Sequence, residues 1–375
     1  MNYKVYIDEH NFGREGLVFG ASSKTQINQK GENDNGNWNP DEDMMSVNKW
    51  QLNGLNGITE QRFFEYTFEA QGNYTHEFSY EDLAGNKAIY KDFSGNEIEN
   101  TRALFTIDHT SPTGTVEIKG FGFWEKLVEG ITFGLFSPST VDMEVTGSDH
   151  TSPVHQVQYT RVHDEMTRDE LEAYNSWSYA SEDRPNFAEF SVSPNEQFVV
   201  YTKVTDYAGN YEFFSSNGMI VDSTKPAPVV TITNLSQSQN GIFNEDVTLQ
   251  IDVEDPTVGD TYSGLEKVWY NVSSTGNVKT GQTIELLNNS KNKKQGNKTF
   301  SQVITIPANV YNSNDVKVQA FAQDFSGNKG DSEITELKID VTNPKISVSW
   351  DLNNPSNGKY YKDTRTATVT VTDRH

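Results

Sequence analysis

Apolar and polar residues alternate along three stretches of this chain, and each stretch ends in the same kind of turn. The alternating positions are Tyr74/His76/Phe78/Tyr80, Phe198/Val200/Thr202/Val204 and Val316/Val318/Ala320/Ala322. Such alternation predicts a strand with one buried face. Asp-x-(Ala/Ser)-Gly-Asn follows each stretch, at 82–86, 206–210 and 324–328. Asp and Asn bond the local backbone and Gly accepts a positive φ, so these segments are predicted turns.

A second signal follows each turn, with the pattern Asp-x-Thr-x-Pro. It begins at Asp108, Asp222 and Asp340, which lie 114 and 118 residues apart. A second predicted strand runs from each turn to this Asp, and Pro cannot continue a central strand. Each unit therefore ends in a hairpin and a Pro-containing linker. A period of this size is a whole domain, so the chain is predicted to be a tandem array of related domains.

This pairing of turn and linker resembles the bacterial immunoglobulin-like (Ig-like) domains of large cell-surface and extracellular proteins. The resemblance implies an all-β chain of tandem Ig-like β-sandwiches arranged end to end. It also implies that the hairpin is strands F and G, and that the linker leads into strand A of the next sandwich. The expected domains are 1–112, 113–226 and 227–344, followed by the truncated start of a fourth at 345–375.

The two ends of the chain carry matching patterns. Residues 4–10 and 368–374 both read as an alternating strand with an acid near its end. If they correspond, the first domain lacks its opening strand, and unpaired sheet edges remain at both ends. We expect fraying or self-association there.

One short helix is expected in the second domain. Thr167 and Glu170 form a capping box, and Leu171 and Tyr174 fall on the following turn, which predicts a helix over about 167–175. Trp177 is expected to pack against it. Trp50 lies at a similar distance before its own turn, which favours the same core role for both tryptophans.

The amino-acid composition limits the possible binding partners of the chain. The 375 residues carry a net charge of −23 and no cysteine, so disulfides are impossible and phosphate contacts with nucleic acid or anionic membrane are disfavoured. The charge favours cations. No apolar run is long enough to span a bilayer, and residues 1–20 lack a signal core. We expect an internal piece of an extracellular or wall-attached bacterial protein.

The sequence gives little support for an enzymatic function. Nucleophile-elbow, zinc-protease, phosphate-loop and dinucleotide motifs are absent. His150, His155 and His163 lie closest to one another but lack the spacing of a zinc site. The polar stretch 31–43 has some EF-hand-like offsets, but its first ligand position would be Gly31, and a surface loop is the default interpretation. We therefore expect a protein that is not an enzyme.

The sharper hypothesis concerns acids at the domain junctions. In an Ig-like sandwich the B–C and F–G loops lie at the pole that receives the preceding domain, where the linker Asp should meet them. The residues expected together are Asp108, Asp149, Asp206 and Asn210 at the first junction, and Asp222, Glu254, Asp255, Asp324 and Asn328 at the second. Clustered carboxylates suit a structural calcium ion. The alternative is that these residues only satisfy their own turns and cap a neighbouring strand.

The second unit is the most aromatic. Exposed clustering of Phe121, Trp124, Trp177 and Tyr179 would favour a platform for a host glycan or protein, whereas burial of all four would favour core packing. Three functions stay open: a non-catalytic stalk or adhesive array whose partners are neighbouring Ig-like domains, a specific binding module, and an accessory region of a large extracellular glycosidase.

Overall fold

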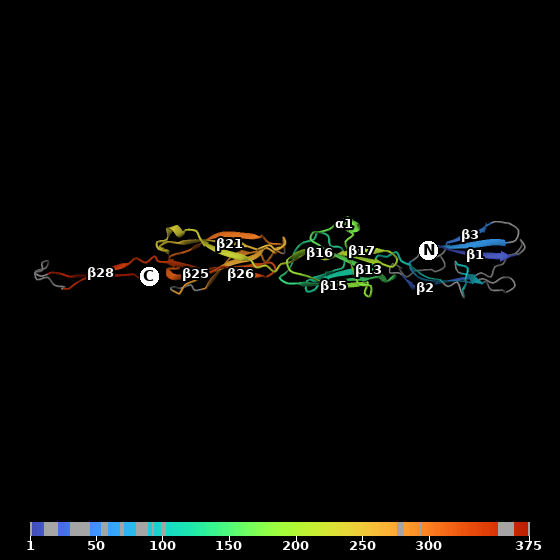
Figure 1. The fold of residues 1–375 in the computed structure, drawn as a ribbon, viewed down its shortest axis with the longest axis horizontal. Coiled ribbons are helices and arrows are strands. Elements are labelled where there is room, and N and C mark those ends of the chain that lie inside the picture. The colour runs from blue at the N-terminus through green and yellow to red at the C-terminus, as the bar shows by residue number, and fades with distance from the viewer. Residues whose placement is uncertain are drawn as a thin grey trace.

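The fold was taken from a computed structural model, which describes residues 2–10, 22–30, 46–53, 59–67, 71–79, 89–91, 94–98, 103–275, 281–292, 294–351 and 364–373. It is nearly all β, and the predicted tandem β-sandwich fold is confirmed. The units follow one another along the long axis of the molecule (Figure 1).

The first unit contains three small sheets. Their orders are β1-β4-β3, β2-β5-β8 and β6-β7. The strands are β1 (Asn2–His10), β2 (Ser22–Lys30), β3 (Ser46–Asn53), β4 (Thr59–Thr67), β5 (Gly72–Ser79), β6 (Tyr90–Lys91), β7 (Glu97–Ile98) and β8 (Ala103–Ile107). The predicted strand before the first turn is β5. The turn at 82–86, the loop at 31–43 and the side chain of Trp50 lie outside the described residues.

The second unit is a sandwich of two sheets, in the orders β10-β9-β12-β15 and β11-β18-β16-β13-β14, with β17 also paired to β16. Its elements are β9 (Thr113–Ile118), β10 (Gly122–Trp124), β11 (Leu135–Ser137), β12 (Val141–Ser148), β13 (Val154–Val162), α1 (Arg168–Ala173), β14 (Ser178–Tyr179), β15 (Phe187–Val192), β16 (Glu196–Asp206), β17 (Tyr211–Ser215) and β18 (Met219–Val221).

The third unit repeats this plan, with sheets β19-β21-β24 and β20-β27-β25-β22-β23, and with β26 also paired to β25. Its elements are β19 (Ala227–Ile232), the 3₁₀ turn η1 (Leu235–Gln237), β20 (Ile242–Phe243), β21 (Val247–Glu254), β22 (Leu265–Ser273), β23 (Gln282–Asn288), β24 (Thr299–Ile306), β25 (Ser313–Asp324), β26 (Lys329–Asp331) and β27 (Thr335–Ile339).

The two sandwiches share one departure from the constant-type Ig arrangement. In that arrangement the fourth strand joins the sheet that holds strands A, B and E. Here the strand after C pairs with C itself, as β14 with β13 and β23 with β22. The third unit thus has a three-stranded sheet facing the sheet that carries the F–G hairpin.

Alternation of apolar and polar residues along the strands explains how the sandwich cores form. In β25, Val316, Val318, Ala320 and Ala322 are fully buried while the residues between them are exposed or half-buried. Strand β21 packs against them with the alternate residues of its own sequence. Each fully buried Val, Leu or Ile side chain contributes roughly 1.5–3 kcal/mol. The predicted half-buried strands therefore supply the inner faces of the sandwich.

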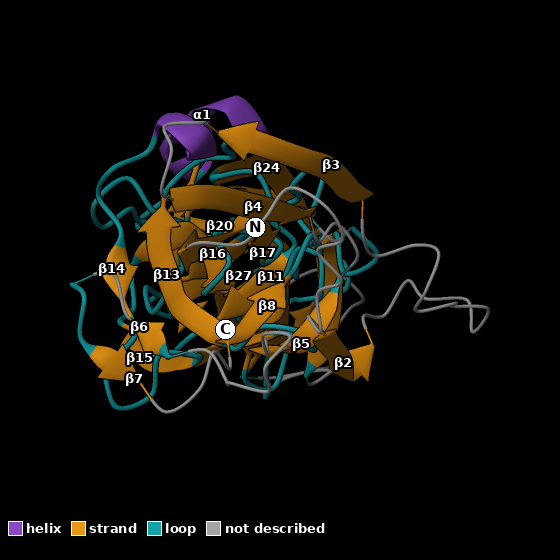
Figure 2. Ribbon diagram, turned by 90° about the vertical axis from the view of Figure 1, so that its right-hand side faces the viewer, coloured by secondary structure: helices purple, strands orange, loops and turns teal. Residues whose placement is uncertain are grey.

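The predicted helix is confirmed as α1. The Thr167 hydroxyl accepts from the Glu170 backbone N–H, and the Glu170 carboxylate accepts from the Thr167 backbone N–H. Leu171 is buried with Tyr201 and Phe213 in a cluster separate from the main core, and Trp177 packs against it as predicted. Figure 2, a view along the long axis, shows α1 on the outside of the strands.

The last two strands, β28 (Lys345–Trp350) and β29 (Ala367–Thr372), pair with each other. Their apolar residues meet across the ladder, with Ile346 opposite Val371 and Val348 opposite Val369, and all four side chains are exposed. This ribbon directly follows Pro344, as β9 follows Pro112 and β19 follows Pro226.

Candidate metal centres at two joints between sandwiches

Two groups of three aspartates lie where one unit passes into the next. We call them the first joint (Asp108, Asp149, Asp206) and the second joint (Asp222, Asp255, Asp324). In each, one carboxylate oxygen per residue lies within 4.8 Å of the others. No other group of three or more acidic or histidine side chains with metal-binding proximity occurs in the described parts of the chain.

The linker aspartate belongs to two sandwiches at once. At the second joint, the backbone N–H of Asp222 donates to the Ser137 carbonyl of the second unit (2.9 Å). Its carboxylate accepts from the Ser263 backbone N–H of the third unit at 2.7 Å. One residue therefore ends one sandwich and enters the acidic pole of the next.

The second joint is sealed from solvent, since Asp222, Asp255 and Asp324 are each 0% exposed. Asp222 accepts from the backbone N–H and the hydroxyl of Thr224 at 2.9 and 2.5 Å. Asp255 Oδ2 accepts from the Gly264 N–H at 2.7 Å, but Asp255 Oδ1 is buried without any hydrogen-bond partner. A buried acceptor left unpaired is costly and calls for a ligand that the carboxylate can bind.

Burial dominates the electrostatics of the second joint. Desolvation, with repulsion from Asp222, raises the pKa of Asp255 to about 7. Desolvation, with repulsion from Asp255 and Asp222, raises the pKa of Asp324 to about 7 against hydrogen bonds from Asn328. Lys298, the cation that favours ionised Asp255, is itself 3.2 Å from Glu254. Among the residues that the structure describes, no Lys or Arg forms a salt bridge with any of the three carboxylates.

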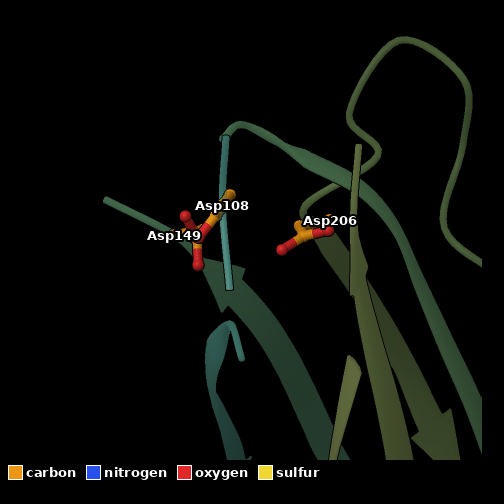
Figure 3. Close-up of side chains that lie close together, drawn as sticks. All are labelled: Asp108, Asp149 and Asp206. Carbon is orange, nitrogen blue, oxygen red and sulfur yellow. The ribbon is translucent and has the colours of Figure 1, made fainter. Parts of the chain in front are cut away.

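The first joint has the same frame but more donors. Figure 3 shows Asp206 extending toward Asp108 and Asp149, which lie together. Asp108 accepts from the backbone N–H and hydroxyl of both Thr110 and Ser152, at 2.6–3.1 Å. Burial opposes ionisation of Asp108, but these hydrogen bonds outweigh it and lower the pKa. Desolvation, aided by repulsion from Asp108 and Asp206, raises the pKa of half-buried Asp149.

The F–G asparagine connects each turn to the linker. Asn210 donates through Nδ2 to the Asp206 carboxylate at 2.9 Å and to the Asp108 backbone carbonyl at 3.1 Å. Asn328 makes the same two bonds, to Asp324 at 2.8 Å and to Asp222 at 2.7 Å. Both asparagines satisfy their own turn and also hold the preceding unit.

Eight of the nine residues expected at the junctions therefore lie in these two networks. Glu254 is the exception, because it is the last residue of β21 and its exposed side chain pairs with Lys298 outside the cluster. Sequence reasoning missed Ser152 and Ser263, which donate to the linker aspartates. Nothing in their local pattern distinguishes them from other loop serines.

The second joint has further contacts across the units. The ring of Phe325, in the F–G turn, lies 5.3 Å from the ring of Phe136 on β11. A Cβ added to Gly330 would lie only 1.8 Å from the Pro226 carbonyl oxygen, so the linker crosses this glycine directly. At the first joint, Gln71 of the first unit donates to Thr151 of the second at 2.8 Å.

The four aromatic candidates occupy different places. Phe121 and Trp124 lie at or beside β10, where Phe121 is 39% exposed and half-buried Trp124 packs against the sandwich core. Tyr179, on β14 of the other sheet, is 55% exposed, while Trp177 packs in the α1 cluster. The set is thus neither fully exposed nor fully buried, and its members do not share one packing cluster.

Comparison with solved structures gives weak likenesses, including the two that follow. One is a 1.5-MDa bacterial ice-binding adhesin, 15% identical with a TM-score of 0.26, with 56% of this chain and 62% of that chain covered. The other is the fibronectin(III)-like modules of Clostridium thermocellum CbhA, 12% identical with a TM-score of 0.24, with 60% and 94% covered. Likenesses at this identity and TM-score do not indicate a function.

No protein-family model matches the chain, and no curated protein does. The helices among the described residues include none with the length and apolarity needed to cross a membrane.

Proposed function

We propose that this chain is a non-catalytic repeat region of a bacterial surface or secreted protein, acting as a stalk or adhesive array, in which calcium ions stiffen the joints. The observation that supports it most is the position of Asp222. Its backbone bonds to the second unit while its carboxylate lies in the acidic cluster of the third. A cation bound there would link the position of one sandwich to the loops of the next.

Calcium suits the chemistry of the second joint. The cluster offers oxygen only, from three carboxylates. The Ser326 hydroxyl, in the same turn as Asp324, is buried without a partner. Calcium takes six to eight oxygen ligands in flexible geometry. Three buried carboxylates without compensating charge are unfavourable, and a divalent ion removes much of that cost. The residues present therefore fit the ion.

Thermal unfolding of the purified chain tests this proposal. We expect the melting temperature of the wild-type chain to be higher in millimolar CaCl₂ than in excess chelator, because the ion binds only the folded state. Asp324→Asn should lose that rise, whereas Asp183→Asn, a change at an exposed acid, should keep it. Equal melting of the wild-type chain in calcium and in chelator would contradict the metal-stiffened joint.

The adhesive part of the proposal concerns host glycan or protein. Exposed Tyr179 and Phe121 are the candidate contacts, because apolar rings that remain in water can stack on a sugar or enter a protein interface. Glycan-array binding that is lost in Tyr179→Ala but kept in Tyr207→Ala, another exposed tyrosine, would support it. Equal array signals for wild type and Tyr179→Ala would argue for a plain spacer.

A further inference from the structure

We infer that the two joints are not equivalent cation sites: the second joint binds calcium tightly, and the first joint binds it weakly because the hydroxyl of Ser152 occupies the oxygen that a cation needs. This inference rests on the proposed function and assigns its metal affinity to one of the two sites.

The second joint has unused oxygen atoms. Asp255 Oδ1 and Ser326 Oγ are both buried and without hydrogen-bond partners. Asp255 belongs to the three-carboxylate cluster and Ser326 to the F–G turn, where its backbone N–H donates to Ser263 Oγ at 3.3 Å. Burying polar atoms without partners is unfavourable, and an ion bound by the three carboxylates would satisfy Asp255 Oδ1.

The first joint has no such deficit at its linker aspartate. Both oxygens of Asp108 already accept two hydrogen bonds, and the Ser152 hydroxyl is 2.6 Å from Oδ2. The Ser152 backbone N–H is also shared with Asp149 Oδ1, at 2.9 Å. A cation at this joint would have to displace or compete with donors that stabilise the metal-free state.

One pair of serines marks the difference. Ser152 and Ser263 both donate a backbone N–H to Oδ2 of their linker aspartate. The Ser152 hydroxyl also binds Asp108, whereas Ser263 Oγ accepts from the Ser326 N–H. Asp222 Oδ2 accepts one hydrogen bond, from the Ser263 N–H, and therefore keeps capacity for a metal. A serine hydroxyl thus occupies the carboxylate oxygen of the linker aspartate at the first joint but not at the second joint.

Burial of the aspartates also favours tighter cation binding at the second joint. All three aspartates of the second joint are 0% exposed, while Asp149 of the first joint is half-buried. Coulomb attraction between a cation and carboxylates is stronger where water is excluded. An ion at the second joint would have mainly protein ligands and leave slowly, whereas one at the first joint would exchange with solvent.

Calorimetric titration of the chelator-treated, dialysed full chain with CaCl₂ tests the inference. We expect one tight site and a second that is at least about tenfold weaker, a difference of about 1.4 kcal/mol. Asp255→Asn should abolish the tight site, and Asp149→Asn should leave it unchanged. Circular dichroism checks that each variant is folded, and Asp324→Asn replaces Asp255→Asn if the latter is not.

Ser152→Ala gives an independent readout of the first joint. Removal of the hydroxyl should tighten the weak site by about threefold to tenfold and leave the tight site unchanged. Two sites of equal affinity, or loss of the tight site in Asp149→Asn rather than Asp255→Asn, would overturn the inequivalence but preserve calcium binding. An absence of binding heat together with an unchanged melting temperature in calcium would instead overturn the proposed function.

Discussion

The side-chain amide of Asn328 donates to the backbone carbonyl of Asp222, 2.7 Å away and 106 residues earlier in the chain. The same amide bonds to Asp324 within its own turn. The turn that closes the F–G hairpin of one sandwich therefore also holds the last residue of the sandwich before it. Asn210 and Asp108 repeat the relationship at the first joint.

Asn328→Ala should loosen the second joint. The substitution removes one bond to a carboxylate and one to a backbone carbonyl, and we expect a loss of about 2–3 kcal/mol in the unfolding free energy of the third sandwich. Chemical denaturation followed by Trp269 fluorescence measures it. The matched control is Asn314→Ala, on an exposed position of β25, and an equal loss in both variants would contradict a special role for Asn328.

Gly330→Ala should prevent the linker at Pro226 from packing against β26. The added methyl group would lie 1.8 Å from the Pro226 carbonyl oxygen, which is backbone and cannot rotate away as a side chain would. We expect increased amide exchange in residues 222–228 with β22 and β25 still protected. Lys329→Ala, at the neighbouring exposed residue, controls for the loss of the β26 surface. Unchanged exchange in Gly330→Ala would show that the close approach is absent in solution.

The metal-free second joint should be more stable in mild acid. Folding raises the pKa of Asp255 and Asp324 from 3.8 to about 7, so the folded state holds protons that the unfolded chain has lost. Stability then falls as the pH rises from about 4 to about 7 and levels off above that. In chelator, the third sandwich should melt at a higher temperature at pH 5.5 than at pH 7.5.

Asp255→Asn should weaken this dependence, because the amide does not titrate and the repulsion that helps to raise the pKa of Asp324 is removed. At the first joint, Asp108 acts in the opposite sense, because its donors lower its pKa and its contribution to stability is lost as the pH falls through that lowered value. Asp149, whose pKa burial raises, acts in the same sense as the second joint. A third sandwich that is less stable at pH 5.5 than at pH 7.5 in chelator would contradict the assigned burial of these acids.

Leu171→Ala should unfold the helical cap without unfolding the sandwich. Leu171 is buried with Val199, Tyr201 and Phe213 on the outer side of β16, apart from the main core. Truncation of such a residue costs about 2–5 kcal/mol of stability. A six-residue helix is not stable without tertiary packing, so α1 should unfold when this contact is lost. Amide exchange should rise in residues 166–178 and stay low in β12. Global unfolding at the same denaturant concentration would show that the two clusters are one core.

Local chemistry made much of the fold predictable. The Asp-x-(Ala/Ser)-Gly-Asn turns and the alternation before them indicated β16 and β25, because strand period and turn preference act over a few residues. The capping box at Thr167 indicated α1 for the same reason. The resemblance then placed the linker aspartate, the B–C loop and the F–G turn at one pole, where the structure has them.

Other features depend on contacts that no local pattern encodes. Ser152 and Ser263 have equivalent backbone bonds but different hydroxyl partners, which are set by the path of the F–G turn. Phe136 and Phe325 meet across the joint from distant parts of the chain. Glu254 was wrongly grouped with Asp255, because the end of β21 leaves these adjacent side chains in different environments, one exposed and one buried.

Small-angle X-ray scattering of the full chain in millimolar calcium and in excess chelator tests whether a cation fixes the geometry of the joints. Cation-linked joints predict a longer maximum dimension and a sharper rod-like cross-section signal in calcium, with both lost in chelator and in the Asp222→Asn variant. Identical scattering curves in calcium and chelator, from samples that remain folded and monomeric, would show that the joints hold their geometry without a metal and contradict the account.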